Sequence, residues 1–441
     1  MRKAVSLLVA IFLTASCIMA AKPAFSSTDT AENTWVTKAP MHVARSNLGV
    51  AVVDGKIYAI GGLAGNGVVT GANEVYDPET DTWSSRKSLP TPRAYFATAV
   101  YQSKVYCIGG TGGANEVYDP ATDTWENKTA MPTPRFALQA NVVNGRIYLI
   151  GGVPDSSAGG FSSVTLNEVY DPLTDSWTTK TPMPHRTSSG ASVTVDGKIY
   201  VIGGLGPEHP GESLNQIYDP ETDTWSLGAT PPSGIGYGVA GATVGVNAPK
   251  RIYSVYDGTQ VYDPENDSWT FGADLPTDRE GFGVAVVDDT LYVIGGFKLS
   301  YAEVYSIDVV VTRYATNEQY TPFGYGTVPP KVQIVSQENT TYETSNVSLA
   351  FTVNKQVSWL SYSLDGGETD TIAGNTTMEG LANGVHNVTV YARDAFGNTG
   401  ASETVSFTVD VPFPTMMVVA PVASVAVIGA GLVLYFKKRK R

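Results

Sequence analysis

One ten-residue phrase recurs along this chain, and such repetition constrains the fold more than any other feature of the sequence. It reads Glu-Val-Tyr-Asp-Pro-Glu-Thr-Asp-Thr-Trp at 74–83, and close variants cover 116–125, 168–177, 216–225 and 260–269. Successive Trp residues lie roughly 42 to 52 positions apart. Periods of this size are typical of repeated supersecondary units that bury one another's apolar faces.

A second phrase lies upstream of each Trp phrase and indicates that the units consist of strands. It is an apolar run that ends in Gly-Gly, although the fifth unit lacks the diglycine and reads Ile-Tyr-Ser-Val-Tyr after Arg251. Asp-Gly and Asn-Gly dipeptides, which favour type I′ hairpins, precede several of these runs. The chain also contains 45 Gly and 26 Pro, which argue against a helical bundle. We therefore predict four short strands per unit.

The order and spacing of the diglycine, the Tyr and the Trp resemble the kelch repeat over about residues 33–311. The resemblance implies a β-propeller of four-stranded blades. WD40 repeats have a similar period but place Asp after the Trp, which no repeat does here. The first Trp, Trp35, precedes any first strand, and the last unit, 279–311, supplies three strands, of which we place the third at 302–307. Strand 33–39 should therefore complete a sixth blade and close the ring.

A second all-β domain should follow a linker at 312–330. Turn signals separate alternating runs, so the region 331–410 is predicted to form a small β-sandwich with Trp359 in its core. It is similar to the immunoglobulin-like or fibronectin-like modules of surface proteins, without a cysteine pair. The expected strands are 331–336, 347–353, 357–364, 385–392 and 404–409.

The two ends of the chain predict a membrane-tethered protein. Residues 1–24 have a basic start, an apolar run and small residues, as a secretory signal peptide does. Residues 415–436 carry no charge and would span about 33 Å as a helix, enough for a bilayer core. The basic tail 437–441 favours a cytoplasmic C-terminus. The alternative for 415–436 is a buried core helix.

The charge and the cysteine content argue against a nucleic-acid-binding protein and against a fold that depends on disulfides. The net charge is −13, and the acidic residues all lie between the basic ends, so a nucleic-acid partner is not expected. The two cysteines are Cys17 and Cys107, and Cys17 falls in the segment that we expect to be removed. The mature fold should therefore contain no intramolecular disulfide.

An arginine precedes the first strand of most units, and the kelch resemblance implies that these arginines ring one face of the propeller. There they could bind a carboxylate through bidentate hydrogen bonds. The alternative is a structural arginine that pairs with acidic or carbonyl groups between blades. The candidate ligand-binding residues on this face are Arg45, Arg93, Arg135, Arg186, Arg279, Tyr95, Tyr237, His185 and Glu280.

Loop lengths on the same face differ between blades. Blades one, three and four carry long loops at 63–72, 153–166 and 205–214, whereas we expect short loops in blades two, five and six. Long loops on a rigid scaffold often carry recognition, although plain variation in length is the alternative. Three histidines fall on loops of this face and could bind metal with neighbouring glutamates, but none has ligand spacing. They are His42, His185 and His209.

Two further motifs concern metal ions and modification. Asp77 and Asp81 in the repeated phrase could suggest a calcium loop, but their recurrence at hairpin positions favours a structural turn. We predict no metal, no cofactor and no catalytic residue. Asn-x-Ser/Thr sequons, which are candidate glycosylation sites, occur at Asn127, Asn266, Asn339, Asn346, Asn375 and Asn387.

These features together predict an extracellular binding or adhesion protein that recognises a glycan, a peptide or a surface protein through the propeller loops. The alternatives are an enzyme on the same fold and a purely architectural part of a surface coat. N-acetylneuraminate mutarotase resembles a six-bladed kelch ring and needs no metal. Galactose oxidase-like enzymes also have kelch blades, but they need a copper site with a cross-linked Cys, and Cys107 lies in an apolar strand.

Overall fold

The computed structural model describes residues 31–412, except positions 66, 156–161, 207–212, 237, 257, 302–308 and 337–339. The chain divides into two units, residues 1–329 and 330–441. The boundary lies next to the predicted start of the second domain at 331. Each unit is described by itself below.

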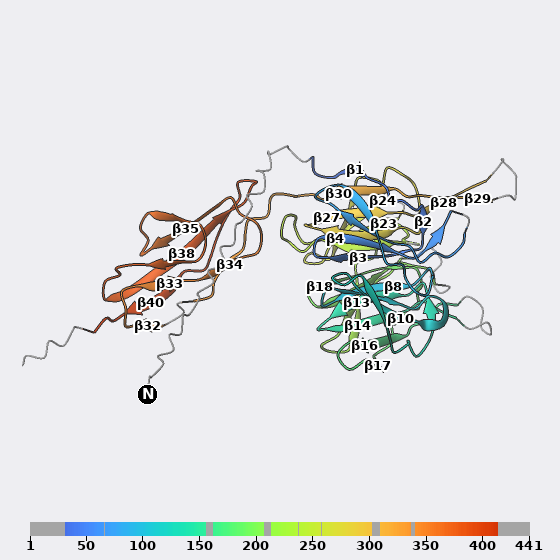
Figure 1. Cartoon of the computed structure of the whole chain (residues 1–441), viewed down its shortest axis with the longest axis horizontal. Helices are drawn as coiled ribbons and strands as arrows, with labels where there is room; N and C mark the ends of the chain where they lie inside the picture. Colours follow the sequence, from blue (N-terminus) through green and yellow to red (C-terminus); the bar gives the residue numbers. More distant parts are fainter. Residues whose placement is uncertain are drawn as a thin grey trace, which may run out of the picture. The chain divides into compact units, whose positions relative to one another are not determined.

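The first unit contains six four-stranded antiparallel sheets, which are the blades of a β-propeller (Figure 1). In blades one to five the strands pair in the order in which they occur along the chain. Blade one consists of β3 (Gly49–Val53), β4 (Lys56–Ile60), β6 (Asn73–Asp77) and β7 (Thr82–Arg86); blade two of β8 (Ala97–Tyr101), β9 (Lys104–Ile108), β10 (Asn115–Asp119) and β11 (Thr124–Lys128); blade three of β13 (Gln139–Val143), β14 (Arg146–Ile150), β16 (Asn167–Asp171) and β17 (Ser176–Thr179). Blade four consists of β18 (Ala191–Val195), β19 (Lys198–Ile202), β20 (Asn215–Asp219) and β21 (Thr224–Gly228); blade five of β22 (Val239–Ala242), β23 (Ile252–Tyr256), β24 (Gly258–Asp263) and β25 (Ser268–Gly272); blade six of β26 (Gly283–Val287), β27 (Thr290–Ile294), β30 (Asn317–Thr321) and β1 (Thr34–Lys38).

The ring closes through the N-terminal strand, as the sequence predicts. The first strands of neighbouring blades contact one another in turn, and β26 of blade six contacts β3 of blade one. Strand β1 pairs with β30 from Thr34 opposite Thr321 to Lys38 opposite Asn317. Residues near both ends of the propeller therefore share one sheet, and the blade has no missing fourth strand.

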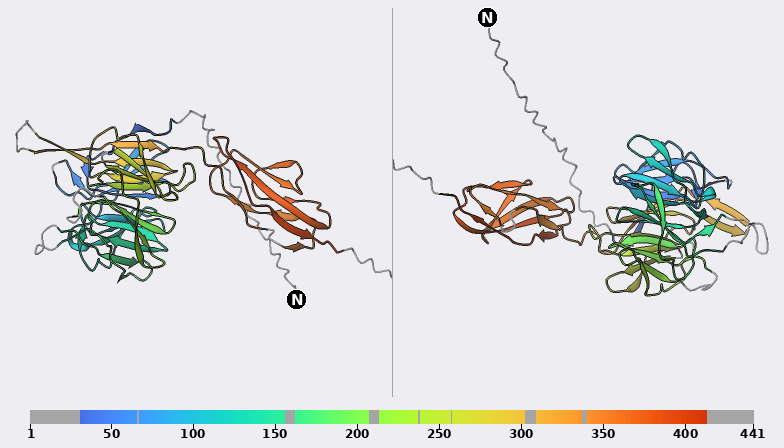
Figure 2. Two further views of the ribbon diagram at one scale, coloured as in Figure 1. Left: turned by 180° about the vertical axis from the view of Figure 1, so that it is seen from behind. Right: turned by 90° about the horizontal axis from the view of Figure 1, so that it is seen from below.

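The last blade corrects one prediction. Its third strand is β30, not 302–307, so the propeller extends to Thr321 and the segment 312–330 is not wholly a linker. Both segments carry a Glu and a Tyr, but Glu318 in β30 pairs with Arg279, and that contact recurs in other blades. Between β27 and β30, two paired strands project from the blades as the arms of a hairpin (Figure 2). It consists of β28 (Phe297–Tyr301) and β29 (Val309–Arg313).

A clamp made of Tyr, Asp and Trp side chains joins each blade to its neighbour. In blade one the Tyr76 hydroxyl donates to Asp81 Oδ1 (2.6 Å), and the same oxygen accepts the N–H of Ala39 (2.9 Å) from blade six. Trp83 Nε1 then donates to the Ala39 carbonyl (2.7 Å). The same contacts recur at Asp123, Asp175, Asp223 and Asp267, and in blade six Asn33 takes the place of the aspartate. We call these contacts the Tyr–Asp clamps.

The rest of the repeated phrase also has a structural role. Asp77 Oδ1 accepts the N–H of Glu79 (3.0 Å) and so holds the turn between the third and fourth strands. The diglycine has a steric cause, because Gly62 has a φ of +99° and a Cβ there would lie 2.6 Å from the Ser46 carbonyl oxygen. The structural interpretation of the Asp-Pro phrase is therefore confirmed for the described residues.

The second unit is a sandwich of β-strands around one core. A large sheet has the order β32-β40-β38-β35-β36, with β39 beside β38, and the short pairs β31–β34 and β33–β37 face it across the core. The core consists of apolar side chains from both sets, among them Val347, Leu349, Val390 and Phe407. The strands are β31 (Val332–Ile334), β32 (Thr341–Tyr342), β33 (Val347–Leu349), β34 (Phe351–Val353), β35 (Trp359–Leu364), β36 (Thr369–Ile372), β37 (Thr376–Met378), β38 (Gly384–Arg393), β39 (Thr399–Ala401) and β40 (Val405–Val409).

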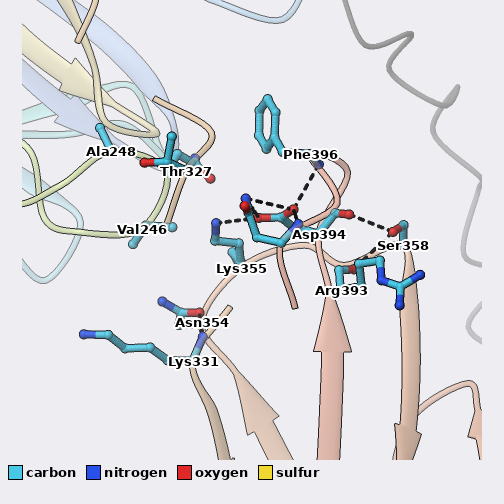
Figure 3. Close-up of polar contacts among 12 residues, drawn as sticks. Val246, Ala248, Thr327, Lys331, Asn354, Lys355, Ser358, Arg393, Asp394 and Phe396 are labelled. Atoms are coloured by element: carbon cyan, nitrogen blue, oxygen red, sulfur yellow. Dashed lines mark hydrogen bonds and ion pairs between the residues drawn. The ribbon is translucent and has the colours of Figure 1, made fainter. Parts of the chain in front are cut away.

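Trp359 is not the core aromatic residue that we expected. Its neighbours in β35, Leu360 and Tyr362, pack against the core, so Trp359 faces the other side of the sheet. There the Arg393 guanidinium lies 4.9 Å from its ring centroid. The adjacent turn is held by the Asp394 carboxylate, which contacts the Lys355 ammonium at 3.0 Å and accepts the Phe396 N–H at 3.0 Å (Figure 3).

The predicted membrane topology falls outside the described residues. The signal peptide 1–24, the hydrophobic segment 415–436 and the basic tail 437–441 all lie there. In the part of the chain that the structure describes, no helix has the length and apolar content needed to cross a bilayer.

Candidate functional site

Two sets of loops form one face of the propeller, which we call the loop face. In blade one, β2 (Arg45–Ser46), which precedes the first strand, pairs with β5 (Leu63–Ala64), which follows the second strand. In blade three, β12 (Arg135–Phe136) pairs with β15 (Val153–Pro154) in the same way. Bridges between Ser188 and Leu205 and between Glu280 and Phe297 repeat this contact in blades four and six. The loops that enter the first strand and those that leave the second strand therefore lie together.

The loop face has a ring of left-handed residues around the propeller axis, which we call the axial mouth. The ring members share a positive φ of 52–62° and are Asn47, Tyr95, Ala137, Ser189 and Gly281. Backbone hydrogen bonds also connect successive members of the ring. The N–H of Asn47 donates to the Gly281 carbonyl (2.6 Å), Tyr95 to Asn47 (3.0 Å), Ala137 to Tyr95 (2.7 Å) and Ser189 to Ala137 (2.9 Å).

Tyr95 is the unusual member of this ring. A bulky side chain at φ +58° is strained, whereas Gly281 adopts the same conformation without penalty. Such strain costs roughly 1–3 kcal/mol and is concentrated at functional sites. The Tyr95 side chain is 39% exposed, and its ring meets Phe136 of the next blade edge-on with centroids 6.4 Å apart. The axial mouth therefore presents an aromatic surface that is held in a defined orientation.

The arginine ring that we expected does not exist as a binding surface. Four arginines, which are Arg45, Arg93, Arg135 and Arg279, are at most 2% exposed. Each pairs with a glutamate at the second position of the third strand. The partners are Glu74, Glu116, Glu168 and Glu318, and we call these contacts the Arg–Glu pairs. The alternative that the sequence left open, a structural arginine, is the one that the structure contains.

The contacts of the Arg–Glu pairs leave little capacity for a ligand. Arg135 Nη1 lies 2.7 Å from Glu168 Oε2, and Nη2 donates to the Leu149 carbonyl (3.1 Å). The other carboxylate oxygen accepts the Thr133 hydroxyl at 2.7 Å. Burial lowers the pKa of Arg45 to about 10, against the opposing effect of Glu74. The Arg45 guanidinium therefore remains charged at neutral pH, and its hydrogen bonds are made within the blade.

Blades four and five lack this pair. In blade two the Arg93 carbonyl accepts the N–H of Gly62, and in blade four Thr187, not Arg186, makes the equivalent contact with Gly152. Arg186 therefore lies one residue before the position that the arginine occupies in the blades with an Arg–Glu pair. Residue type alone does not reveal this offset. Thr187 Oγ1 donates to Gly203 instead (2.8 Å).

In blade five Ile235 holds the equivalent position, and its carbonyl accepts the N–H of Gly204. Both blades also carry glutamine where the others carry glutamate, at Gln216 and Gln260. Each glutamine is at most 2% exposed, and both accept a backbone N–H, from His185 (2.9 Å) and Ser233 (3.3 Å) respectively.

The remaining candidates are spread over the loop face. Glu280 is adjacent to Gly281 of the axial mouth, and burial, with a smaller effect of Asp278, raises its pKa. His185 is half-buried. Tyr237, which follows Ile235 by two residues as Tyr95 follows Arg93, lies outside the described residues. The structure thus brings Tyr95 and Glu280 to the mouth and removes four arginines from it.

The loop lengths require a second correction. Blade six has the longest connection between its second and third strands, not a short one, because it includes the β28–β29 hairpin. Leu299, Val309, Val310 and Val311 on this hairpin are 38–50% exposed. Blade five is short as predicted, since β24 begins two positions after the end of β23. The asymmetry of the loop face is therefore larger than the sequence indicated.

A polar cluster beside the axis was not predicted. Asn141 Nδ2 donates to Ser192 Oγ (2.9 Å), which lies 3.3 Å from Gln139 Oε1. These residues occupy first strands of blades three and four, where other blades carry mostly small or apolar residues. Comparison of the first strands position by position could have identified Gln139 and Asn141. The same comparison would not identify Phe136, because what distinguishes Phe136 is its contact with Tyr95 of the neighbouring blade.

A hollow of about 510 Å³ lies away from the axial mouth. It includes Asn144 and Pro220, which belong to turns on the face opposite the loops. Its two cations already have partners, since Arg146 lies 3.0 Å from Asp171 and Lys180 lies 3.7 Å from Asp223. We therefore place the candidate site at the axial mouth and not in this hollow.

Within the described residues, no group of His, Cys, Asp and Glu is arranged to hold a metal ion. His209, one of the three loop histidines, lies outside those residues. Cys107 is fully buried in β9, and burial raises the pKa of its thiol to about 12. A thiol in this environment is unreactive.

Comparisons with known proteins agree with the architecture of the first unit. The family model described as the KLHDC2/KLHL20/DRC7 Kelch-repeats domain matches residues 23–152, and the Kelch motif model matches 186–232. The solved structure titled "Structure of YjhT" is similar with a TM-score of 0.50 and 17% identity, over 62% of this chain and 99% of that chain. This likeness concerns the fold alone. The first unit is a kelch β-propeller.

One curated protein is similar over a short stretch. Halomucin from Haloquadratum walsbyi (strain DSM 16790 / HBSQ001) is 42% identical over 76 residues. The match covers 16% of this chain and spans about 1% of the length of halomucin.

Proposed function

We propose that the chain is an outward-facing binding protein of the cell surface, and that the axial mouth of its propeller binds a carbohydrate. The observation that carries the proposal is Tyr95, an exposed aromatic side chain held at φ +58° in the ring around the axis. Aromatic rings offer an apolar face and a hydroxyl group, which suits the mixed surface of a sugar. The buried arginines argue against recognition through an arginine–carboxylate contact.

The asymmetry of the loop face supports binding in one orientation. A sixfold-similar surface would offer a ligand several equivalent positions. The face opposite the loops has this character, because the same Asp-Pro turn recurs there. Among the described residues of the loop face, Tyr95 and Phe136 form an aromatic contact between neighbouring blades, which the other blades do not repeat. Loops at this end of a rigid scaffold are the usual place for recognition.

The location follows from the two ends of the chain. In this proposal residues 1–24 direct export, 415–436 anchor the chain with its C-terminus in the cytoplasm, and the second unit is an immunoglobulin-like spacer. Protease added to intact cells should then release both units and leave a C-terminal tag intact. Digestion of the tag together with the propeller would contradict the topology.

A glycan array probed with the full-length protein tests the binding function. Wild-type protein should bind one or a few glycans, and Tyr95→Ala should weaken binding roughly tenfold or more, which corresponds to about 1.4 kcal/mol. Tyr101→Ala is the matched control, because Tyr101 ends β8 at the opposite face of the same blade. Equal loss in both variants, or binding unchanged in Tyr95→Ala, would contradict the proposal.

A second candidate function is catalysis on a sugar, as in mutarotase-like kelch enzymes. Glu280 supports it, because a half-buried carboxyl with a raised pKa next to the mouth is a candidate general acid or base. Incubation of the bound sugar with wild-type protein and with Glu280→Gln, followed by NMR of the anomeric signals, distinguishes the two functions. Acceleration of anomer exchange that disappears in the variant would favour the enzyme.

A further inference from the structure

Three sequons of the second unit share one side-chain geometry. Asn346, Asn375 and Asn387 are all exposed, and each uses its carboxamide oxygen as a hydrogen-bond acceptor. Asn346 Oδ1 accepts the N–H of Gly380 (3.1 Å), Asn375 Oδ1 accepts the N–H of Phe351 (3.0 Å), and Asn387 Oδ1 accepts the Ser406 hydroxyl (2.6 Å).

These contacts fix the plane of each carboxamide. With the oxygen directed at its hydrogen-bond donor, the Nδ2 atom points away from that donor, because the two atoms lie on opposite sides of the same planar group. Among the described residues, none of the three nitrogen atoms has a hydrogen-bond partner. A substituent on Nδ2 therefore extends into solvent without the loss of a contact within the protein.

The sequon at Asn266 is different. Its Nδ2 donates to Asp263 Oδ2 at 2.7 Å inside the tight turn between β24 and β25. The next residue, Asp267, is also fixed, since it accepts the Tyr262 hydroxyl in a Tyr–Asp clamp. Asn127 is exposed on β11, but no contact orients its carboxamide, and Asn339 lies outside the described residues. The geometry therefore separates three sequons from the rest.

We propose that Asn346, Asn375 and Asn387 carry N-linked glycans and that Asn266 does not. Asn346 and Asn375 lie at opposite ends of the β33–β37 pair, and Asn387 lies in β38 of the large sheet, so both layers of the second unit carry a site. The glycans cover the outer surfaces of this unit, which keeps it hydrated and limits contact with other proteins. The inference rests on the outward location in the proposed function, but on no ligand of the propeller.

The modification is a group transfer from a lipid-linked sugar donor. Nδ2 forms a bond to the anomeric carbon of the glycan, and the bond between that carbon and an oxygen of a polyprenyl phosphate or pyrophosphate breaks. The lipid phosphate leaves with the bonding electron pair, and one proton of Nδ2 passes to a base of the transferase. The hydroxyl group two residues later in the sequon is required for recognition.

Mass spectrometry of peptides from the full-length protein, purified from cells that naturally express it, tests the inference. Hexose-containing or other glycan masses are expected on the peptides of the three sites, and the Asn266 peptide should have the unmodified mass. Unmodified Asn at all three sites in protein that surface biotinylation shows to be exported would overturn the inference and leave the binding function untouched. Modification of Asn266 alone would overturn it as well.

Variants of Thr389 sharpen the test at one site without a change of the asparagine. Thr389→Val removes the sequon at Asn387 and keeps the side-chain shape, whereas Thr389→Ser keeps both the sequon and a hydroxyl that can reach Thr404, its partner at 2.8 Å. Thr389→Val should lose one glycan mass and Thr389→Ser should retain it, with similar melting temperatures. Loss of the glycan in both variants, or in neither, would contradict the assignment of Asn387.

Discussion

Blades one, two, three and six hold a buried Arg–Glu pair beneath the loop face, whereas blades four and five hold Thr187 with Gln216 and Ile235 with Gln260. The arginine and the glutamate are present together or absent together. A lone buried charge is strongly destabilising, while a neutral replacement of both partners is tolerated. The comparison teaches that each pair is a single structural unit and not part of a ligand-binding ring.

The Tyr–Asp clamps provide the contrast. They occur in all six blades, and each one joins a blade to its neighbour. The Arg–Glu pairs act within a blade, so two blades can do without them. Variation between blades is therefore concentrated on the loop face, where the axial mouth also lies.

The largest effect should come from removal of one member of an Arg–Glu pair. Arg279→Ile leaves Glu318, which is 1% exposed, without its cation, and should lower the free energy of unfolding by about 3–5 kcal/mol. The double variant Arg279→Ile/Glu318→Gln copies blade five and should recover most of this loss. Denaturant unfolding of the three proteins measures both effects. A double variant as unstable as the single one would break the comparison.

Introduction of a glutamate into a blade that lacks the arginine should lower the free energy of unfolding by a smaller amount, and this loss should depend on pH. Gln260→Glu places a carboxyl group in blade five opposite Ile235 and should cost about 2–3 kcal/mol at pH 7. Burial raises the pKa of this carboxyl in the folded state, so the loss should shrink as the pH falls toward its unfolded pKa of about 4.3. Ile235→Arg/Gln260→Glu rebuilds the pair and should restore stability at pH 7. Unfolding curves at pH 5 and pH 7 test these expectations, and a loss that does not depend on pH would argue against a buried carboxylate.

The smallest effect should come from a Tyr–Asp clamp. Hydrogen bonds from Tyr76 and the Ala39 N–H lower the pKa of Asp81, so its contribution to stability is present above the unfolded pKa and is lost as the pH falls through the lowered folded pKa. Asp81→Asn copies Asn33 of blade six and should change stability by only about 0.5 kcal/mol at pH 7. Melting temperatures between pH 7 and pH 2.5 should show a shallower acid loss in the variant. An identical pH profile would mean that the carboxylate charge of Asp81 is not part of the clamp.

Much of the fold could be predicted from the sequence, because residues that recur in each repeat make the same contacts in each blade. The closing strand followed from Trp35, and the Tyr–Asp clamps explain why the phrase persists. The error in blade six arose because 302–307 also carries Glu-Val-Tyr, and local residue type cannot show which segment lies beside β27. Trp359 was misplaced for a similar reason, since alternation fixes two faces of a strand but not which one is buried.

The site was less predictable than the fold. Residue type placed the arginines on the correct side of the propeller. It did not show that these arginines are buried, because each one pairs with a glutamate of the third strand, such as Glu74. Arg186 looked equivalent to the others, and only the hydrogen bond from Gly152 to Thr187 shows the offset of one residue. Tyr95 was selected correctly as a residue of this face, but its positive φ and its contact with Phe136 cannot be read from one sequence.

The central claim is that the axial mouth binds the ligand and the Arg–Glu pairs hold the scaffold. Titration calorimetry with the sugar identified on the array, applied to wild type, Tyr95→Ala and Arg279→Ile/Glu318→Gln, tests it most directly. The account predicts a Kd at least roughly tenfold weaker for Tyr95→Ala and a Kd within about twofold of wild type for the double variant. Unchanged binding in Tyr95→Ala together with lost binding in a folded double variant would contradict the account.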